Sequence, residues 1–221
     1  MIVLKTSREL ALMREACRIS AGALQVAGEA VRPGISTWEI DKIAYDYIKS
    51  QGAEPNFLNL YGFPATACIS INDEVIHGIP SKKRILKSGD IVSIDLGAKI
   101  GGYNGDNAAT FACGEISEEA KRLIETTRES LYEAIKMAVP GGKIGDIASA
   151  VQTYCESRGY SVVREYTGHG VGKELHEDPS VPNYGTAGRG VRLLPGMTIA
   201  IEPMINQGTA RVKVLPDGWT V

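Results

Sequence analysis

Residues 91–106, which read IVSIDLGAKIGGYNGD, decide the fold of this chain. The apolar run over residues 91–96 is typical of a buried strand, and it carries an acid, Asp95, inside it. Gly101-Gly102 predicts a hairpin turn, so that a second strand passes through Asp106. Residues that face each other across an antiparallel hairpin share a constant index sum, which is odd for a loop of even length. Because 95 and 106 also give an odd sum, both carboxylates are expected on one face of the hairpin.

Two neighbouring carboxylates on one sheet face repel each other unless a cation or a proton lies between them. A metal site is therefore one interpretation of Asp95 and Asp106. The other is a pair of acids at strand ends that water solvates, as it solvates most acidic side chains. The hairpin by itself leaves both interpretations open.

Helical patterns precede the hairpin and end at glycine. Ser7 is expected to cap a first helix, which stops at Pro33-Gly34. Ser36 is expected to cap a second helix, which ends at Gly52.

The same pattern returns 107 residues later. A helix over residues 117–137 stops at Pro140-Gly141-Gly142, and a second over residues 144–155 ends at Gly159. The chance recurrence of common helix punctuation would explain the Pro-Gly pairs alone. One register that continues from helix into strand favours two copies of one α+β half. The matched positions are Pro33 with Pro140, Gly34 with Gly141, Tyr47 with Tyr154, Gly52 with Gly159, Gly89 with Gly196, and Asp95 with Glu202.

We therefore predict an α+β fold built from two pseudo-symmetric halves, approximately 1–110 and 111–221. No linker separates the halves, so residues 1–221 are expected to form a single domain, with a central antiparallel sheet flanked by helices. A pseudo-two-fold axis would bring the equivalent carboxylates, Asp95 and Glu202, to a central cleft.

The three histidines, His77, His169 and His176, all lie beside glycine or proline. A neighbouring glycine lets other groups approach an imidazole closely. A lone histidine is more often a core or surface residue than a ligand, but three in such settings favour ligands. Glu202 follows the apolar run over residues 197–201, which is expected to be a buried strand. An acid at the end of a buried strand costs free energy unless it is paired or metal-bound.

Carboxylates with one or two imidazoles suit manganese, iron or cobalt at least as well as zinc. Bridging carboxylates would hold two ions roughly 3.5–4 Å apart and activate a shared hydroxide. The sequence has no phosphate-binding loop, no dinucleotide fingerprint and no nucleophile elbow. These observations point to metal-assisted hydrolysis.

The bulk composition excludes several classes of protein. The net charge of −2 gives no electrostatic footprint for nucleic acid or an anionic membrane. No run is long enough to span a bilayer, and the N-terminus lacks a secretory signal. The four cysteines form no C-x-x-C pair, which favours reduced thiols in the cytoplasm, most simply interpreted as small core residues.

Taken together, these motifs resemble those of type I methionine aminopeptidases, which are metallopeptidases with the pita-bread fold. The resemblance covers essentially the whole chain, with the motifs in order, and it is specific because several motifs agree. It implies an enzyme that removes the initiator methionine from new proteins whose second residue is small. The matching segments are Cys68-Ile69-Ser70-Ile71-Asn72, His77-Gly78-Ile79-Pro80, Gly89-Asp90-Ile91-Val92-Ser93-Ile94-Asp95, Gly105-Asp106, Gly168-His169-Gly170-Val171-Gly172, His176-Glu177-Asp178-Pro179, Ile201-Glu202-Pro203-Met204 and Asp217-Gly218-Trp219-Thr220-Val221.

The resemblance implies two divalent ions, drawn from Co²⁺, Mn²⁺, Fe²⁺ and Zn²⁺. Asp95 and Asp106 would be carboxylate ligands, with Asp106 bridging both ions. His169 and Glu202 would ligate the other ion, and Glu202 would also take part in the proton transfer that activates the hydroxide.

The resemblance also implies a set of residues that bind the substrate. His77 and His176 would hydrogen-bond the scissile peptide and stabilise its oxyanion. Phe63, Cys68 and Trp219 match positions that line a narrow, apolar methionine pocket. The implied partners are the N-termini of nascent polypeptides, with the ribosome as a further candidate, and the chain is expected to be a monomer.

One departure from the family concerns its fifth metal ligand, a bridging glutamate on a strand that follows the segment matching Trp219-Thr220-Val221. The sequence ends at Val221. The expectation is therefore either a C-terminally truncated form or a form that lacks this ligand, and in both cases one that holds fewer ions.

Two other functions fit the same residues. Prolidases and aminopeptidase P share the fold and most ligands, although they usually carry a large extra N-terminal domain. A catalytically inactive pita-bread protein that binds a partner is the second alternative. The four ligand residues present, Asp95, Asp106, His169 and Glu202, argue against a decayed site.

Overall fold

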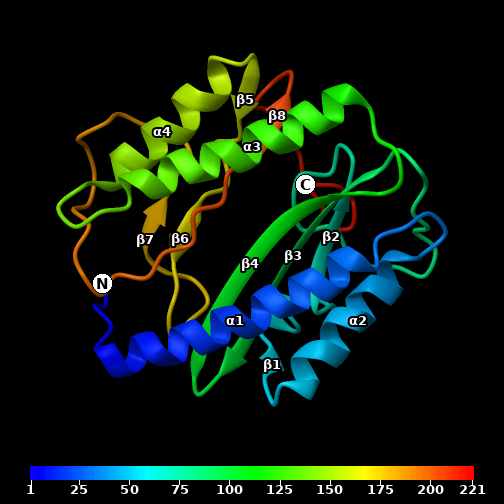
Figure 1. Cartoon of the computed structure of the whole chain (residues 1–221), viewed down its shortest axis with the longest axis horizontal. Helices are drawn as coiled ribbons and strands as arrows, with labels where there is room; N and C mark the ends of the chain where they lie inside the picture. The colour runs from blue at the N-terminus through cyan, green and yellow to red at the C-terminus, as the bar shows by residue number, and fades with distance from the viewer. The chain divides into compact units, whose positions relative to one another are not determined.

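The computed structural model describes residues 1–221 and divides them into two compact units (Figure 1). The hairpin unit consists of Ala11–Ser117 and Lys213–Val221. The His169 unit consists of Met1–Leu10 and Glu118–Val212. Each unit thus includes a terminal segment taken from the far end of the sequence. These bounds differ from the predicted halves, and the single domain stays a prediction.

The sheet of the hairpin unit is antiparallel throughout. Strand β3 (Ile91–Ile100) pairs along its whole length with β4 (Tyr103–Ala112). Its other edge pairs with β1 (Glu54–Pro55) and β2 (Ala67–Ile71). The turn is formed by Gly101 and Gly102, whose φ angles of 58° and 83° lie in the region that favours glycine. The predicted hairpin is confirmed.

Helices α1 (Ser7–Glu29) and α2 (Thr37–Ser50) lie along this sheet, in blue in Figure 1. Alternate residues of each strand point toward them and build the core, because successive side chains of a strand point to opposite faces. The core joins both helices to one sheet face through Ile19, Ala23 and Ala27 of α1, Ile40, Ala44 and Ile48 of α2, Ala67 and Ile69 of β2, and Val92, Ile94, Leu96 and Ala98 of β3. A short 3-10 turn, η1, spans Leu60–Gly62.

The predicted capping residue is correct for α2 and incorrect for α1. Ser36 caps α2 as predicted, and Glu39 completes a capping box with it. The prediction that Ser7 caps α1 is wrong, because Ser7 is the first helical residue. The cap is Thr6, whose N–H donates to the Glu9 carboxylate at 2.8 Å. Two adjacent hydroxyl residues offer the same cap, and the glutamate three positions after Thr6 decides between them.

The His169 unit contains two helices and two short antiparallel sheets. Helix α3 (Glu118–Met137) packs against α4 (Ile144–Glu156), in green and yellow-green in Figure 1. One sheet pairs β5 (Tyr160–Val162) with β8 (Ile205–Gln207), and the other pairs β6 (Gly168–Gly170) with β7 (Glu177–Val181). Its core consists of Ala134, Ile144, Ile147, Val151, Cys155, Val162, Val181 and Leu193.

The prediction of a regular strand over residues 197–201 is wrong. Ile199 forms only an isolated bridge with Gly170. The neighbouring strand β6 has three residues, and its pairing with β7 shifts register between His169 and Gly170. A strand this short and irregular offers too few aligned groups for a longer ladder.

Hydrogen bonds repeat at the 107-residue offset. The Gly34 N–H donates to the Leu86 carbonyl at 2.8 Å, and the Gly141 N–H donates to the Leu193 carbonyl at 2.9 Å. Both glycines have nearly the same positive φ, 89° and 90°. The capping carboxylate of Glu39 in α2 likewise has a counterpart in α4, where Asp146 accepts from the N–H of the residue before the helix. The duplication seen in the sequence is thus also present in local geometry.

The fold is α+β, as predicted, with helices and antiparallel strands. None of its helices is both long and apolar enough to cross a membrane.

Candidate metal centre

Asp95 and Asp106 lie on one face of the hairpin unit's sheet. The register pairs Asp95 with Ala108 and Gly97 with Asp106. Paired residues point to the same side, and so do residues two apart on one strand. The two carboxylates are therefore diagonal neighbours on the face opposite the helices, and both are half-buried. The predicted common face is confirmed.

Cys68 shares that face, because β2 pairs it directly with Asp95. Burial raises the pKa of the Cys68 thiol well above its ordinary value of 9.0, and the negative charges of Asp95 and Asp106 raise it further. The thiol is consequently neutral at physiological pH. It offers a soft, polarizable contact rather than a nucleophile.

Three aromatic rings gather in the same unit. The rings of Phe63 and Trp219 meet edge to face with centroids 5.1 Å apart, and the His77 ring lies 6.4 Å from Trp219. Phe63 is buried. Burial also lowers the pKa of His77 below its ordinary value of 6.5, so this imidazole is neutral near pH 7. The structure thus brings His77, Phe63 and Trp219 together.

The segment that carries His77 is fixed by close backbone contacts. His77 itself has a φ of 59°, which is uncommon for a residue with a side chain. The Ile69 N–H donates to the Gly78 carbonyl at 2.8 Å, and a Cβ on Gly78 would lie 2.3 Å from the Ile69 carbonyl oxygen. Glycine is therefore required after His77, because only a residue without a side chain permits this approach. On the other side, Val221 pairs with Val75 and Ile76.

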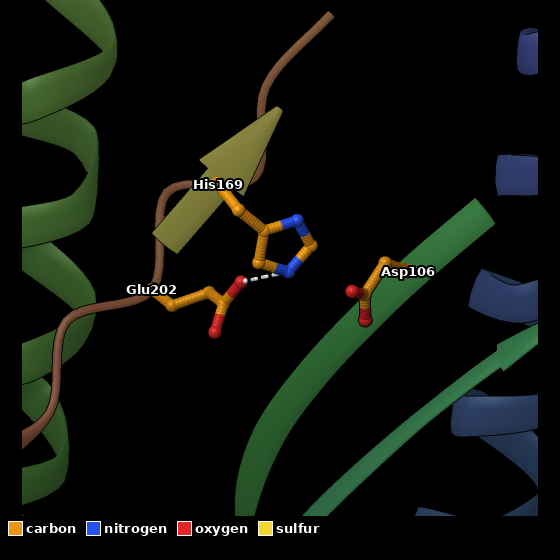
Figure 2. A group of neighbouring side chains, drawn as sticks. All are labelled: Asp106, His169 and Glu202. Atoms are coloured by element: carbon orange, nitrogen blue, oxygen red, sulfur yellow. Dashed lines mark ion pairs between the residues drawn. The ribbon is translucent and has the colours of Figure 1, made fainter. Parts of the chain in front are cut away.

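In the His169 unit, His169 and Glu202 face each other (Figure 2). The Nε2 atom of His169 lies 3.1 Å from Oε1 of Glu202, and its Nδ1 atom lies 2.7 Å from the Gly170 carbonyl oxygen. A carbonyl can only accept, so Nδ1 carries a proton. A neutral imidazole then turns the lone pair of Nε2 toward the carboxylate.

Two electron-rich atoms at this separation repel unless a proton or a cation lies between them. Metal-bound histidines usually hold their other ring N–H on a carbonyl or carboxylate, as His169 does on Gly170. The arrangement therefore fits a metal ligand. Asp106, drawn on β4 in Figure 2, is half-buried like His169 and Glu202, and each of the three offers one ligand atom.

His176 lies close to His169, with ring centroids 4.4 Å apart and planes at 74°. The loop that joins them is held by Lys5, which sequence reasoning missed. The Lys5 ammonium lies 2.6 Å from the Glu177 carboxylate; Lys5 is buried and Glu177 is half-buried. The N–H of Glu174 in turn donates to Glu177. A single lysine near the N-terminus gives no sequence signal for this role.

Asn183 is a second residue that the sequence did not reveal. Its side chain is fully buried, and its Nδ2 donates to the backbone carbonyl of Glu202 at 2.6 Å. In the sequence it precedes Tyr184-Gly185 and is typical of a turn.

Comparison with known proteins gives one family. Residues 11–219 match metallopeptidase family M24. The chain is 53% identical to methionine aminopeptidase 1 of Bacillus subtilis, over 100% of this chain and 89% of that protein.

Solved structures give the same result as the sequence comparison. A methionine aminopeptidase from Thermotoga maritima superposes with a TM-score of 0.98 at 45% identity, covering 100% of this chain and 88% of that one. A prolidase from Pyrococcus horikoshii is less similar, with a TM-score of 0.77 and 31% identity over 92% of this chain and 56% of its own.

Proposed function

This chain belongs to metallopeptidase family M24, and from that premise we propose that it is a methionyl aminopeptidase that removes the initiator methionine from nascent proteins whose second residue is small. The likeness to methionine aminopeptidases over the whole chain carries this proposal. The site chemistry supports it, because carboxylates and an imidazole with a fixed tautomer suit a hydrolytic metal centre.

Four residues would hold the metal: Asp95, Asp106, His169 and Glu202. We propose that they hold at most two divalent ions, chosen from Co²⁺, Mn²⁺, Fe²⁺ and Zn²⁺, with fewer than two expected in this form. Oxygen-rich ligands favour the first three at least as much as zinc. When bound, such ions make water a strong nucleophile at neutral pH and polarise the scissile carbonyl.

The protein's own groups would perform the remaining steps. Glu202 would accept the proton of the attacking water and pass it on, since its Oε1 is buried and lies 3.1 Å from His169. His77 and His176 would donate hydrogen bonds to the scissile peptide and to the oxyanion that forms on it. The lowered pKa of His77 leaves it neutral, and a neutral imidazole carries one N–H donor.

Phe63, Cys68 and Trp219 would bind the methionine side chain. Phe63 and Trp219 supply apolar faces, and the neutral thiol of Cys68 is a soft partner for a thioether. A pocket of this kind recognises the first side chain by shape and apolar contact.

Nascent polypeptide N-termini are the proposed partners, with the ribosome as a further candidate. We propose a cytoplasmic monomer. Reduced cysteines support this location, since the four thiols are all free.

Prolidase activity is a weaker candidate. The prolidase likeness has lower identity and a lower TM-score than the likeness to methionine aminopeptidases. Members of one fold family can differ in substrate, so peptide specificity is the deciding measurement.

The test compares peptides that differ only at their second residue. With Mn²⁺ or Co²⁺ supplied, methionine should be released from Met-Ala-Ser much faster than from Met-Ile-Ser, because a bulky second residue obstructs the site. His169→Ala serves as the inactive control. Equal cleavage of both peptides, or efficient cleavage of peptides that lack methionine and carry proline second, would contradict the proposal.

A further inference from the structure

Glu202 occupies a stretch of chain without strand pairing. Strand β8 begins only at Ile205, and the preceding bridge is the isolated pair of Gly170 and Ile199. Its counterpart at the 107-residue offset, Asp95, lies inside β3 with a partner on each side. The two equivalent acids are therefore held differently. Asp95 has a strand partner on each side, whereas Glu202 has no strand partner.

Asn183 supplies a support that the strand does not. Its Nδ2 donates to the Glu202 carbonyl at 2.6 Å, a short hydrogen bond. The residue lies just beyond β7, in which Val181 pairs with Gly168, the neighbour of His169. Asn183 thus ties the main chain of Glu202 to the hairpin that carries His169.

The amide is also costly to bury. Asn183 is 0% exposed, and its Oδ1 has no hydrogen-bond partner in the protein. A buried polar atom without a partner destabilises a fold, and an apolar residue of similar size avoids that cost. The position of Asn183 is therefore poorly explained by stability alone and well explained by the bond to Glu202.

We propose that Asn183 is a positioning residue that fixes Glu202 against His169 and thereby sets the affinity of the site for a divalent ion. It acts through the backbone of Glu202 and touches neither substrate nor metal. When the Asn183 amide donor is removed, the Glu202 carbonyl shifts toward another donor. The Glu202 carboxylate then moves from its place 3.1 Å from His169. This inference rests on the proposed metal-dependent function.

The experiment measures Mn²⁺ affinity by titration calorimetry on the full chain and on Asn183→Leu. Leucine fills a similar volume and removes both the donor and the unpartnered oxygen. We expect the dissociation constant to rise about tenfold or more, in the range typical when the support of a metal ligand is lost. With a Met-Ala-Ser peptide, kcat should fall while KM changes little, since the methionine pocket is untouched.

Asn206→Leu is the matched control. The Asn206 amide donates to the Thr209 carbonyl at 3.1 Å in the same unit, but this bond is exposed and does not hold a proposed ligand. The control should keep the parent's affinity. The metal-free melting temperature of each variant is measured in parallel, so that loss of fold and loss of affinity are separated.

The outcomes are distinct. Unchanged Mn²⁺ affinity in folded Asn183→Leu overturns the inference, as does an equal loss in Asn206→Leu. Should Asn183→Leu fail to fold, Asn183→Ala removes the donor without added bulk, and the same comparison decides. A parent chain that binds no metal and releases no methionine contradicts the proposed function itself, before any variant is compared.

Discussion

At the scale of single residues, the tautomer of His169 distinguishes it from the other two histidines. Its Nδ1–H is committed to the Gly170 carbonyl, so Nε2 is left as a lone-pair donor beside Glu202. His77 instead lies among aromatic rings in the other unit. These surroundings support the proposed roles of His169 in metal binding and of His77 in substrate contact.

Alanine substitution should separate the two roles. His169→Ala is expected to weaken Mn²⁺ binding at least 10–100-fold, since it removes a proposed ligand. His77→Ala should leave metal content nearly unchanged while lowering turnover of Met-Ala-Ser strongly. Elemental analysis after dialysis, alongside steady-state kinetics, checks both. Metal loss in the His77 variant would show that the histidines are assigned wrongly.

His77 should also make the stability of the metal-free chain depend on pH. Burial lowers its pKa in the folded state below the ordinary 6.5. Below that pH the unfolded chain binds a proton that the folded chain does not, so stability rises with pH in this window. The contribution is intact above pH 6.5 and is lost as pH falls from 6.5 through the folded pKa.

Urea midpoints measured between about pH 7.5 and pH 5 should therefore fall less steeply for His77→Gln than for the parent chain. The glutamine variant has no group that titrates in this range at that position. Parallel curves for the two proteins would mean that His77 has a similar pKa in both states.

The sequence predicted most of the candidate residues at this scale, because chemistry-bearing types in Gly/Pro-rich segments are unusual enough to stand out. It missed Asn183 and Lys5 for a physical reason. Both act through long-range contacts, with Glu202 and Glu177, that no local pattern encodes. An asparagine before Tyr-Gly and a lysine near an N-terminus are both ordinary surface residues until the fold buries them.

At the scale of elements, predictions succeeded where the signal was local. The α2 cap at Ser36 and the hairpin at Gly101-Gly102 depend on residues within four positions of each other. The strand over residues 197–201 failed because an apolar run indicates burial but not a partner. Only the fold reveals that β6 is so short that it pairs with this segment at a single bridge, between Gly170 and Ile199.

The N-terminal segment holds the loop between His169 and His176, and one pair dominates this contact. The side chains of Lys5 and Glu177 are only 4% and 14% exposed. Lys5→Ala leaves a buried carboxylate without its cation, which should lower the free energy of unfolding by about 3–5 kcal/mol. Denaturation in urea, followed by circular dichroism, measures the change.

A matched control is Lys42→Ala. Lys42 forms a helix-surface pair with Asp46, and these side chains are 53% and 58% exposed. Its loss should cost at most about 0.5 kcal/mol. Replacing both Lys5 with methionine and Glu177 with glutamine should recover much of the stability. Equal effects of Lys5→Ala and Lys42→Ala would mean that the pair does not stabilise the loop.

At the scale of the whole molecule, each of the two compact units is built from two segments that are not contiguous in the sequence. Met1–Leu10 belongs with Glu118–Val212, and Lys213–Val221 belongs with Ala11–Ser117. Helix α1 begins in one unit at Ser7 and continues in the other. Melting either unit alone would therefore break this helix or release a segment on which the other depends.

We accordingly expect a single unfolding transition in scanning calorimetry, with equal calorimetric and van't Hoff enthalpies, although chains above 150 residues often deviate from this behaviour. The metal-free protein is the proper sample, since a bound ion would stabilise the states that hold it. Two resolved transitions would instead assign the units to separate domains.

The division of the chain also bears on its own synthesis. A ribosome adds Lys213–Val221 after the rest of both units, so strands β3 and β4 are made long before the segment that completes their unit. These strands therefore lack Lys213–Val221 while the whole of Glu118–Val212 is translated. That segment brings Trp219 to Phe63. An enzyme proposed to trim newborn chains would therefore complete the apolar wall of its methionine pocket only after the His169 unit has been made.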